Sequence, residues 1–228
     1  MEIKIIGFDA DDTLWVNEPY YREAEKKFCD LLINYLPEEE TDKILYKTEM
    51  QNLELYGYGA KGFMLSLIET AINISGGKIP SKEILKIIDI GKELLQKPIV
   101  LLDDVENVLK SISEKYKLII ASKGDLLDQE RKLKKSGLAK YFHHIEIMSD
   151  KKTEDYQKLF QHLDIKPNEF LMIGNSLRSD IFPVISLGGK AIHVPYHTTW
   201  IHEEIDDSQI SNKKYKEVET LSDVLEFL

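Results

Sequence analysis

A chain of 228 residues is long for one compact domain and short for two, which fits a core domain carrying an inserted subdomain. Its 40 acidic residues against 30 lysines and arginines give a formal net charge of -10, so neither nucleic acid nor a membrane is an expected partner. The single cysteine, Cys29, excludes an internal disulfide; we expect a buried, inert thiol and a cytoplasmic location. The opening apolar run is too short for a signal peptide.

The chain begins with an expected strand and continues into an expected helical insert. Residues 3–8 form a short apolar run that stops at a group of acids, which is typical of a buried strand. Apolar residues then recur at helical spacing through four segments, residues 21–35, 41–55, 63–74 and 81–95. We therefore expect an all-helical insert of residues 17–96 within a core of residues 1–16 and 97–228.

Strand and helix patterns alternate after residue 97. The apolar runs that predict strands are residues 117–121, 144–148, 170–173 and 191–194. The helical patterns beside them are residues 105–112, 126–136, 154–163 and 181–187. This alternation indicates an α/β fold with a doubly wound, mainly parallel sheet built from right-handed βαβ units. In such sheets ligands bind at the carboxyl ends of the strands.

Polar side chains follow four of the predicted strands. Asp9 and Asp11 come after the first strand and Ser122 ends the second. Lys151 follows the third strand and Asn175 the fourth. Because Asp9 and Asp11 are two residues apart on an extended strand end, we expect both carboxylates to face one cleft.

These residue types suit phosphoryl transfer. One carboxylate can attack phosphorus while the other protonates the leaving oxygen and later deprotonates water. Two carboxylates so close together are costly without a cation, and Mg²⁺ prefers carboxylate and phosphate oxygens. A serine hydroxyl can donate to a phosphate oxygen, and a lysine can stabilise the charge on the transferred group.

The chain resembles the haloacid dehalogenase superfamily, in its phosphatase branch. The family's four motifs occur in order, and a helical cap is inserted after the first motif. The matching residues are Asp9-Ala10-Asp11-Asp12-Thr13, then Ser122, then Lys151 with Lys152 as an alternative, then Gly174-Asn175 with Asp180. The resemblance covers nearly the whole chain and implies a five-stranded Rossmann-like sheet in the order 5-4-1-2-3.

The resemblance also implies an activity, namely a magnesium-dependent phosphatase that acts on a small phosphorylated metabolite. Asp9 would form a phosphoaspartate, and Asp11 would serve as general acid and base. Ser122 and Lys151 would hold the phosphate. Mg²⁺ would bind the carboxylate of Asp9 and the backbone carbonyl of Asp11, with Asn175 as a further ligand.

Asn175 departs from the family's pattern, which more often has a metal-binding aspartate at this position. An amide oxygen can still ligate Mg²⁺, but one negative charge is missing. We therefore expect wild type to bind Mg²⁺ more weakly than Asn175→Asp. Asp180, also assigned to the metal site, would act by binding metal-bound water or Lys151.

Local structural roles remain as alternatives for the same residues. The acidic pair, Ser122 and Asn175 could be turn residues, and Lys151 a solvated lysine at a helix start. Asp12 is expected to cap a helix or to be solvated. In the insert, Lys61 is the candidate for a substrate contact, and its alternative is an exposed lysine.

Four other functions are alternatives to the phosphatase. A phosphomutase shares every motif but passes the phosphoryl group to a sugar. A dehalogenase needs no protonating acid at position 11 and no metal. A receiver domain is much shorter and lacks a helical insert, whereas a non-catalytic binding protein on this fold stays possible. The sequence predicts neither a particular substrate nor an oligomeric state.

Overall fold

The computed structural model describes residues 2–203 and 215–228 and divides into two compact units. The α/β unit comprises residues 1–18, 99–123 and 129–228. The helical unit comprises residues 19–98 together with the short segment 124–128. In the described parts of the chain, no helix has the length and apolar character needed to cross a membrane.

The α/β unit is built on a six-stranded sheet in the order β3-β2-β1-β4-β5-β6, with every neighbouring pair parallel. The strands are β1 (Ile5–Phe8), β2 (Lys117–Ser122), β3 (His144–Ile147), β4 (Phe170–Gly174), β5 (Lys190–His193) and β6 (Lys216–Glu217). The predicted fold class is confirmed, and the five expected strands lie in the expected order. The sixth strand, β6, was not predicted, because its two residues form no apolar run.

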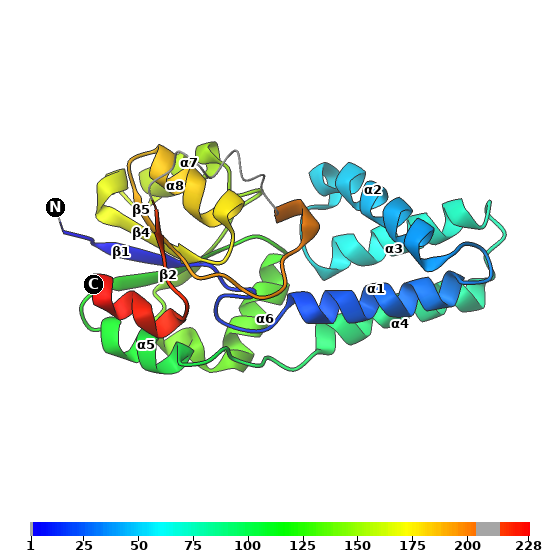
Figure 1. Cartoon of the computed structure of the whole chain (residues 1–228), viewed down its shortest axis with the longest axis horizontal. Helices are drawn as coiled ribbons and strands as arrows, with labels where there is room; N and C mark the ends of the chain where they lie inside the picture. The colour runs from blue at the N-terminus through cyan, green and yellow to red at the C-terminus, as the bar shows by residue number, and fades with distance from the viewer. Residues whose placement is uncertain (1, 204–214) are drawn as a thin grey trace. The chain divides into compact units, whose positions relative to one another are not determined.

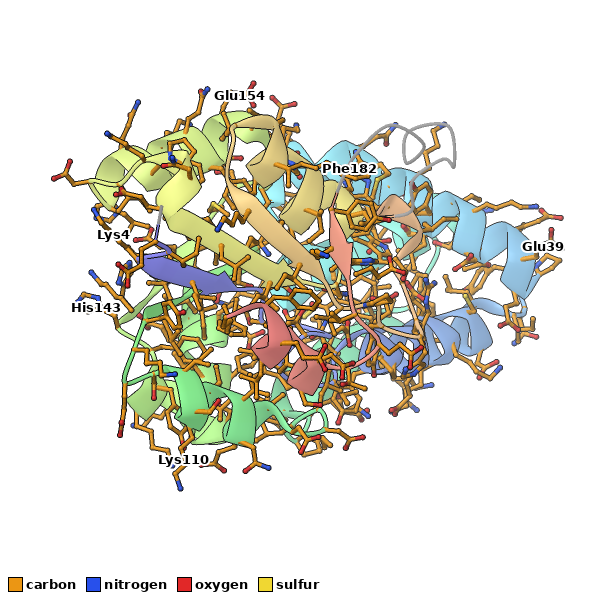
Figure 2. All side chains as sticks on the ribbon, turned by 60° about the vertical axis from the view of Figure 1, so that its left-hand side comes forward. Lys4, Glu39, Lys110, His143, Glu154 and Phe182 are labelled. Carbon is orange, nitrogen blue, oxygen red and sulfur yellow. The ribbon has the colours of Figure 1, made fainter. Side chains whose placement is uncertain are left out.

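Helices cover both faces of this sheet (Figure 1). They are α5 (Val105–Ile112), α6 (Leu126–Ser136), α7 (Thr153–His162) and α8 (Phe182–Ser186). Figure 2 shows Lys110 of α5 and Glu154 of α7 on opposite sides of the strands. Side chains alternate along a strand. Ile6 and Phe8 therefore pack in the cluster that contains α5, while Ile5 packs in the cluster that contains α7.

The helical unit has its own hydrophobic core. Its helices are α1 (Glu18–Leu32), α2 (Glu38–Tyr56), α3 (Ala60–Ile74) and α4 (Ser81–Gln96). Each helix contributes a fully buried side chain to one cluster: Phe28, Leu45, Leu67 and Ile87. Cys29 is buried in the same cluster, as expected, and burial raises the pKa of its thiol to about 12. The thiol is therefore protonated and unreactive at neutral pH.

Candidate active site

The carboxyl ends of β1, β2 and β4 meet at one edge of the sheet. Phe8, the last residue of β1, pairs with Ile120 on β2 and with Ile173 on β4. The backbone N–H of Asp9 continues this ladder and donates to the carbonyl of Ile173 over 2.9 Å. The parallel register thus brings together residues that are far apart in the sequence.

At this edge one buried lysine joins two carboxylates. Lys151 Nζ forms an ion pair with Asp9 Oδ1 and lies 2.7 Å from Asp180 Oδ1. The side chains of Lys151 and Asp180 are each 1% exposed. Burial by itself lowers the pKa of Lys151, but the charges of Asp180 and Asp9 outweigh burial and raise it. Burial raises the pKa of the Asp9 carboxyl to about 7, against the opposing charge of Lys151.

The structure brings Lys151, rather than Lys152, to Asp9. The backbone of Lys151 is left-handed, with φ 53°, a conformation that is uncommon outside glycine and often found at functional sites. The next residue, Lys152, precedes α7 and pairs with Asp150 over 2.6 Å. Its side chain is 67% exposed. Of the two possible registers, only Lys151 places its ammonium group beside the candidate nucleophile.

Thr13 connects Asp9 to Asn175. Its hydroxyl Oγ1 is buried and lies 3.2 Å from both Asp9 Oδ2 and Asn175 Oδ1. A hydroxyl has one proton, so it donates to one of these oxygens at a time. The contacts show that the amide oxygen of Asn175 and a carboxylate oxygen of Asp9 lie on either side of the same small side chain.

Asp180 is held by its own loop. Its Oδ2 accepts a hydrogen bond of 3.0 Å from the backbone N–H of Ser176, while its Oδ1 binds Lys151. A Cβ atom on Gly174 would lie 2.3 Å from Asp180 Oδ2, so a residue with a side chain cannot occupy position 174 without displacing this carboxylate. The structure places Asp180 on the lysine, which is one of the two roles expected for it.

The donor set at this edge fits Mg²⁺. It offers the Asp9 carboxylate and the Asn175 amide oxygen, with the backbone carbonyl of Asp11 as the expected third ligand. Mg²⁺ is commonly held by one or two carboxylates plus water and substrate phosphate. Across residues 2–203 and 215–228, no three histidine, cysteine, aspartate or glutamate side chains gather in a metal-binding arrangement. The oxygen donors around Asp9 suit a hard cation.

Asp11 has a different set of partners from Asp9. Its Oδ1 accepts from Trp15 Nε1 at 2.7 Å and from Lys132 Nζ at 2.8 Å, and its Oδ2 accepts from Gln129 Nε2 at 3.0 Å. Strand alternation does not orient Asp11, although the charge of Asp11 still acts on Asp9. The strand ends at Phe8, and the chain turns through a left-handed residue, Asp12, with φ 62°.

Gln129 joins Asp11 to Ser122. The same Nε2 atom that contacts Asp11 lies 2.7 Å from Ser122 Oγ, and the Ser122 hydroxyl donates to the carbonyl of Lys123 over 3.0 Å. Sequence reasoning missed both Gln129 and Lys132, because polar residues on α6 look like an exposed helix face. Their three-residue spacing, which places them on one side of a helix, is the signal that could have indicated a shared role.

Asp12 caps the start of α1. Its Oδ1 accepts from the backbone N–H of Asn17 at 2.8 Å, and its Oδ2 accepts from that of Glu18 at 2.9 Å. Burial raises the pKa of Asp12 to about 8 despite these bonds. The expected capping role is confirmed by these contacts.

A second buried ion pair lies on the other side of the loop that follows β4. Glu203 pairs with Lys123 and accepts hydrogen bonds from Ser176 Oγ and, at 2.6 Å, from Ser179 Oγ. Burial is the largest single influence and raises the pKa of Glu203, but the charge of Lys123 and the hydrogen bonds from Lys123, Ser176 and Ser179 together outweigh it, and the pKa falls to about 2. This network was not predicted, because its members come from three separate segments of the chain.

Lys61 lies in the helical unit. Its Nζ is 2.9 Å from Asp125 Oδ1, and its side chain is 48% exposed. Close by, Gly59 has φ 105°, and a Cβ atom there would lie 3.1 Å from the backbone nitrogen of Asp125. The structure therefore pairs the candidate substrate lysine with a carboxylate of the segment 124–128.

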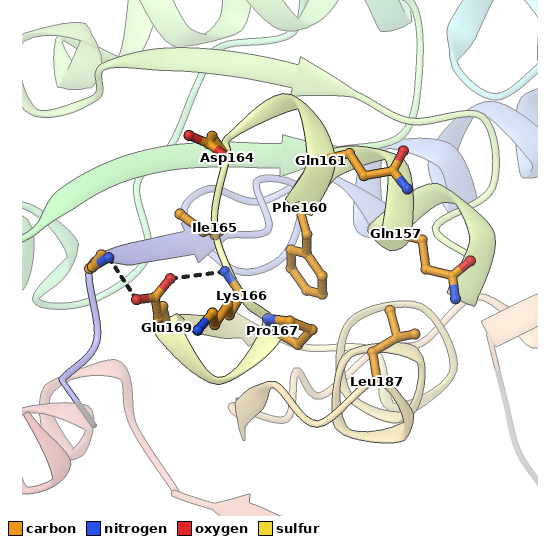
Figure 3. Close-up of a pocket in the computed structure, with 10 residues that line it drawn as sticks. Gln157, Phe160, Gln161, Asp164, Ile165, Lys166, Pro167, Glu169 and Leu187 are labelled. Carbon is orange, nitrogen blue, oxygen red and sulfur yellow. Dashed lines mark hydrogen bonds and ion pairs between the residues drawn. The ribbon is translucent and has the colours of Figure 1, made fainter.

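A hollow of about 790 Å³ lies at the opposite edge of the sheet, before β1 and β4 begin (Figure 3). Its wall includes Phe160, Leu187 and an ion pair of 2.6 Å between Lys4 and Glu169. None of the candidate catalytic residues lines it. It is therefore separate from the arrangement around Asp9.

Comparisons with known proteins identify a family. The sequence profile of haloacid dehalogenase-like hydrolases matches residues 3–187. A haloacid dehalogenase-like family hydrolase from Xanthomonas campestris is 38% identical, with a TM-score of 0.85 over 96% of this chain and 88% of that chain. No curated protein matches the sequence.

More distant solved structures share the fold. One is the HAD-hydrolase YfnB from Bacillus subtilis, described as bound to magnesium, which is 15% identical with a TM-score of 0.69 over 100% of this chain and 99% of that chain. Another is described as a predicted phosphoglycolate phosphatase from Haemophilus somnus. It is 17% identical with a TM-score of 0.66 over 100% of this chain and 98% of that chain.

Proposed function

Because the chain belongs to the haloacid dehalogenase-like hydrolases, we propose that it is a magnesium-dependent phosphatase acting on small phosphate monoesters through a phosphoaspartate on Asp9. The observation that carries this proposal is that the two carboxylates, Asp9 and Asp11, contact different residues. Asp9 contacts a buried lysine, whereas Asp11 is joined through Gln129 to the hydroxyl-bearing Ser122. A phosphate ester needs a nucleophile, a proton carrier and a phosphate-binding group.

In the first step, Asp9 attacks the phosphorus atom of the ester. The new bond joins a carboxylate oxygen of Asp9 to phosphorus, and the bond from phosphorus to the ester oxygen breaks. Asp11 gives its proton to the departing oxygen, so the product leaves as a neutral alcohol. Lys151, already an ion-pair partner of Asp9, offsets the charge of the nucleophile and of the transferred group.

In the second step, water attacks the phosphorus atom of the phosphoaspartate. Asp11, now ionised, takes the proton of this water. The bond between phosphorus and Asp9 breaks, which releases inorganic phosphate and restores the carboxylate. Ser122 donates to a phosphate oxygen through its hydroxyl once this group turns away from the carbonyl of Lys123.

The proposed cation would be held by the Asp9 carboxylate, the Asn175 amide oxygen and the Asp11 backbone carbonyl. When bound, Mg²⁺ supplies positive charge that draws phosphate oxygens toward the nucleophile. Asp180 keeps Lys151 in place from the opposite side, over 2.7 Å. The helical insert remains the predicted cap, and Lys61 remains its candidate substrate contact.

A dehalogenase receives less support from the same residues. Cleavage of a carbon–halogen bond needs no proton donor, so the three hydrogen bonds made by Asp11 would have no purpose in that reaction. A phosphomutase would use the same residues but would transfer the phosphoryl group to a second hydroxyl. Release of inorganic phosphate distinguishes hydrolysis from this transfer.

The test measures inorganic phosphate released from p-nitrophenyl phosphate and from a panel of phosphorylated metabolites, with and without Mg²⁺. We expect activity that requires Mg²⁺ and falls at least about 10⁴-fold in Asp9→Asn. Lys152→Met serves as the matched control, because this neighbouring lysine is exposed and pairs with Asp150 rather than with Asp9 or Asp180. Equal activity of Asp9→Asn and wild type would refute the proposal, as would turnover of a haloacid without turnover of any ester.

A further inference from the structure

We propose that Lys132 and Gln129 of α6 are positioning residues that hold the carboxylate of Asp11 for proton transfer to and from the substrate. This inference rests on the proposed phosphatase function and deepens it. Both side chains belong to the α/β unit, as does Asp11. Their three-residue spacing places them on the same side of α6.

Lys132 is fixed by two acceptors. Its Nζ lies 2.8 Å from Asp11 Oδ1 and 2.9 Å from Asn17 Oδ1, and its side chain is largely buried. Two other lysines of this helix, Lys134 and Lys135, are exposed. A long side chain that is largely buried and bonded at its end keeps one geometry, whereas an exposed lysine exchanges between many. Lys132 can therefore hold Asp11 in one place.

Gln129 is more deeply buried than Lys132. It is 2% exposed, and its Nε2 faces three acceptors: Asp11 Oδ2 at 3.0 Å, Ser122 Oγ at 2.7 Å and the carbonyl of Lys123 at 3.2 Å. Its Oε1 is buried and has no hydrogen-bond partner among the described residues. A buried acceptor without a partner is unfavourable. The orientation of the Gln129 amide is therefore set by the three acceptors of its Nε2 atom.

Asp11 accepts two hydrogen bonds at Oδ1 and one at Oδ2. Each carboxylate oxygen has two lone-pair directions. Oδ1 already accepts from Trp15 and Lys132, which occupies both directions, whereas Oδ2 accepts only from Gln129 among the residues that the structure describes. The geometry therefore assigns proton exchange with the substrate to Oδ2. This is also the oxygen whose donor contacts Ser122, the proposed phosphate-binding residue.

Positioning of a proton donor predicts a dependence on the leaving group. p-Nitrophenolate departs without a proton, whereas an alkoxide needs one. For Lys132→Met, we expect kcat with an alkyl phosphate to fall at least about tenfold more than kcat with p-nitrophenyl phosphate, with KM little changed. Lys132→Arg, which keeps a charged donor, should recover part of the loss. Lys135→Met, the same change at an exposed position of α6, should match wild type with both substrates.

A double-mutant cycle supplies the second readout. In an Asp11→Asn background, Lys132→Met should add no further selective loss, because the group that it positions is no longer acidic. Gln129→Leu, of similar size and unable to donate, should show the same dependence on the leaving group. This variant tests the inference even if Lys132→Met fails to fold, as judged by circular dichroism.

The outcomes separate this inference from the function on which it rests. If wild type hydrolyses no phosphate ester, the proposed function fails and this inference fails with it. If wild type is active but Lys132→Met and Gln129→Leu lose the same factor with alkyl and aryl esters, the two residues have only a structural role. An additive selective loss in the Asp11→Asn background would also overturn the inference.

Discussion

Two ion pairs with the same separation illustrate how the two units use charge differently. In the α/β unit, Lys151 lies 2.7 Å from Asp180, and both side chains are 1% exposed. In the helical unit, Lys43 lies 2.7 Å from Glu39, but these side chains are 68% and 83% exposed. Water screens the second pair and not the first. Burial, rather than distance, therefore decides how much each pair matters.

The buried set is also unbalanced in charge. Lys151 forms ion pairs with two buried carboxylates, Asp9 and Asp180, whereas Lys43 forms an exposed ion pair with Glu39. An excess carboxylate that is excluded from water is costly without a further cation. The same imbalance that would weaken a purely structural cluster makes this edge of the sheet suited to a divalent ion.

The largest expected effect follows from removing the central cation. In Lys151→Met, Asp9 and Asp180 would be left buried and unpaired, and we expect the free energy of unfolding to fall by about 3–5 kcal/mol. Chemical denaturation with and without Mg²⁺ measures this, and the ion should recover part of the loss. Lys152→Met, at an exposed site, should change stability by less than about 0.5 kcal/mol. Equal losses of stability in Lys151→Met and Lys152→Met would contradict the conclusion that burial decides how much an ion pair contributes.

The next effect concerns the second buried pair and depends on pH. The pKa of Glu203 is lowered from 4.5 to about 2, so its charge stabilises the fold above pH 4.5, and this contribution is lost as the pH falls toward 2. We expect Glu203→Gln to be about 2 kcal/mol less stable than wild type at pH 7. Urea denaturation from pH 7 down to pH 4 should show the difference beginning to shrink below pH 4.5. A difference that grows on acidification would contradict the assignment.

A carboxylate can also be added to the buried set, instead of a charge being removed from it. Asn175→Asp places a third carboxylate beside Thr13 and Asp9. Without metal, we expect a loss of about 1 kcal/mol in stability from repulsion between the carboxylates. With metal, we expect Mg²⁺ to bind about tenfold more tightly, because ligand charge increases the affinity for the ion. Titration calorimetry measures the affinity, and equal affinities would refute the role of position 175.

The smallest expected effect lies in the helical unit. Lys61 and Asp125 are 2.9 Å apart, with side chains 48% and 30% exposed. Lys61→Ala should change the free energy of unfolding by no more than about 0.5 kcal/mol. If KM for the preferred ester nevertheless rises, Lys61 contacts substrate as predicted. A large loss of stability would instead show that exposed pairs in this unit carry more weight than the comparison allows.

The fold was predictable because its signals are local. Apolar runs such as residues 117–121 and 170–173 are continuous in the sequence, and each became a buried strand of the sheet. The order of the strands came from a resemblance, since apolar runs do not state which strand pairs with which. The short edge strand β6 has no such signal, because its two residues, Lys216 and Glu217, are charged and exposed.

The candidate site was predictable only in part. Motif residues that directly follow strands, such as Asp9 and Lys151, meet because parallel strands end at one edge of the sheet. Gln129, Lys132 and Glu203 have no comparable signal, since a helix surface and a loop contain many polar residues that remain in water. Their contacts with Asp11 and Lys123 join residues that are far apart in the sequence, so they are seen only in the folded chain.

The grouping of residues 124–128 with the helical unit has a consequence for protein engineering. The chain changes unit at four junctions, after residues 18, 98, 123 and 128. Excising residues 19–98 and closing the gap would therefore leave residues 124–128, which include the first three residues of α6, without the rest of their unit. A chimaera that exchanges this insert for a relative's should therefore exchange both segments together, so that residues 19–98 keep the segment 124–128 that belongs to the same unit.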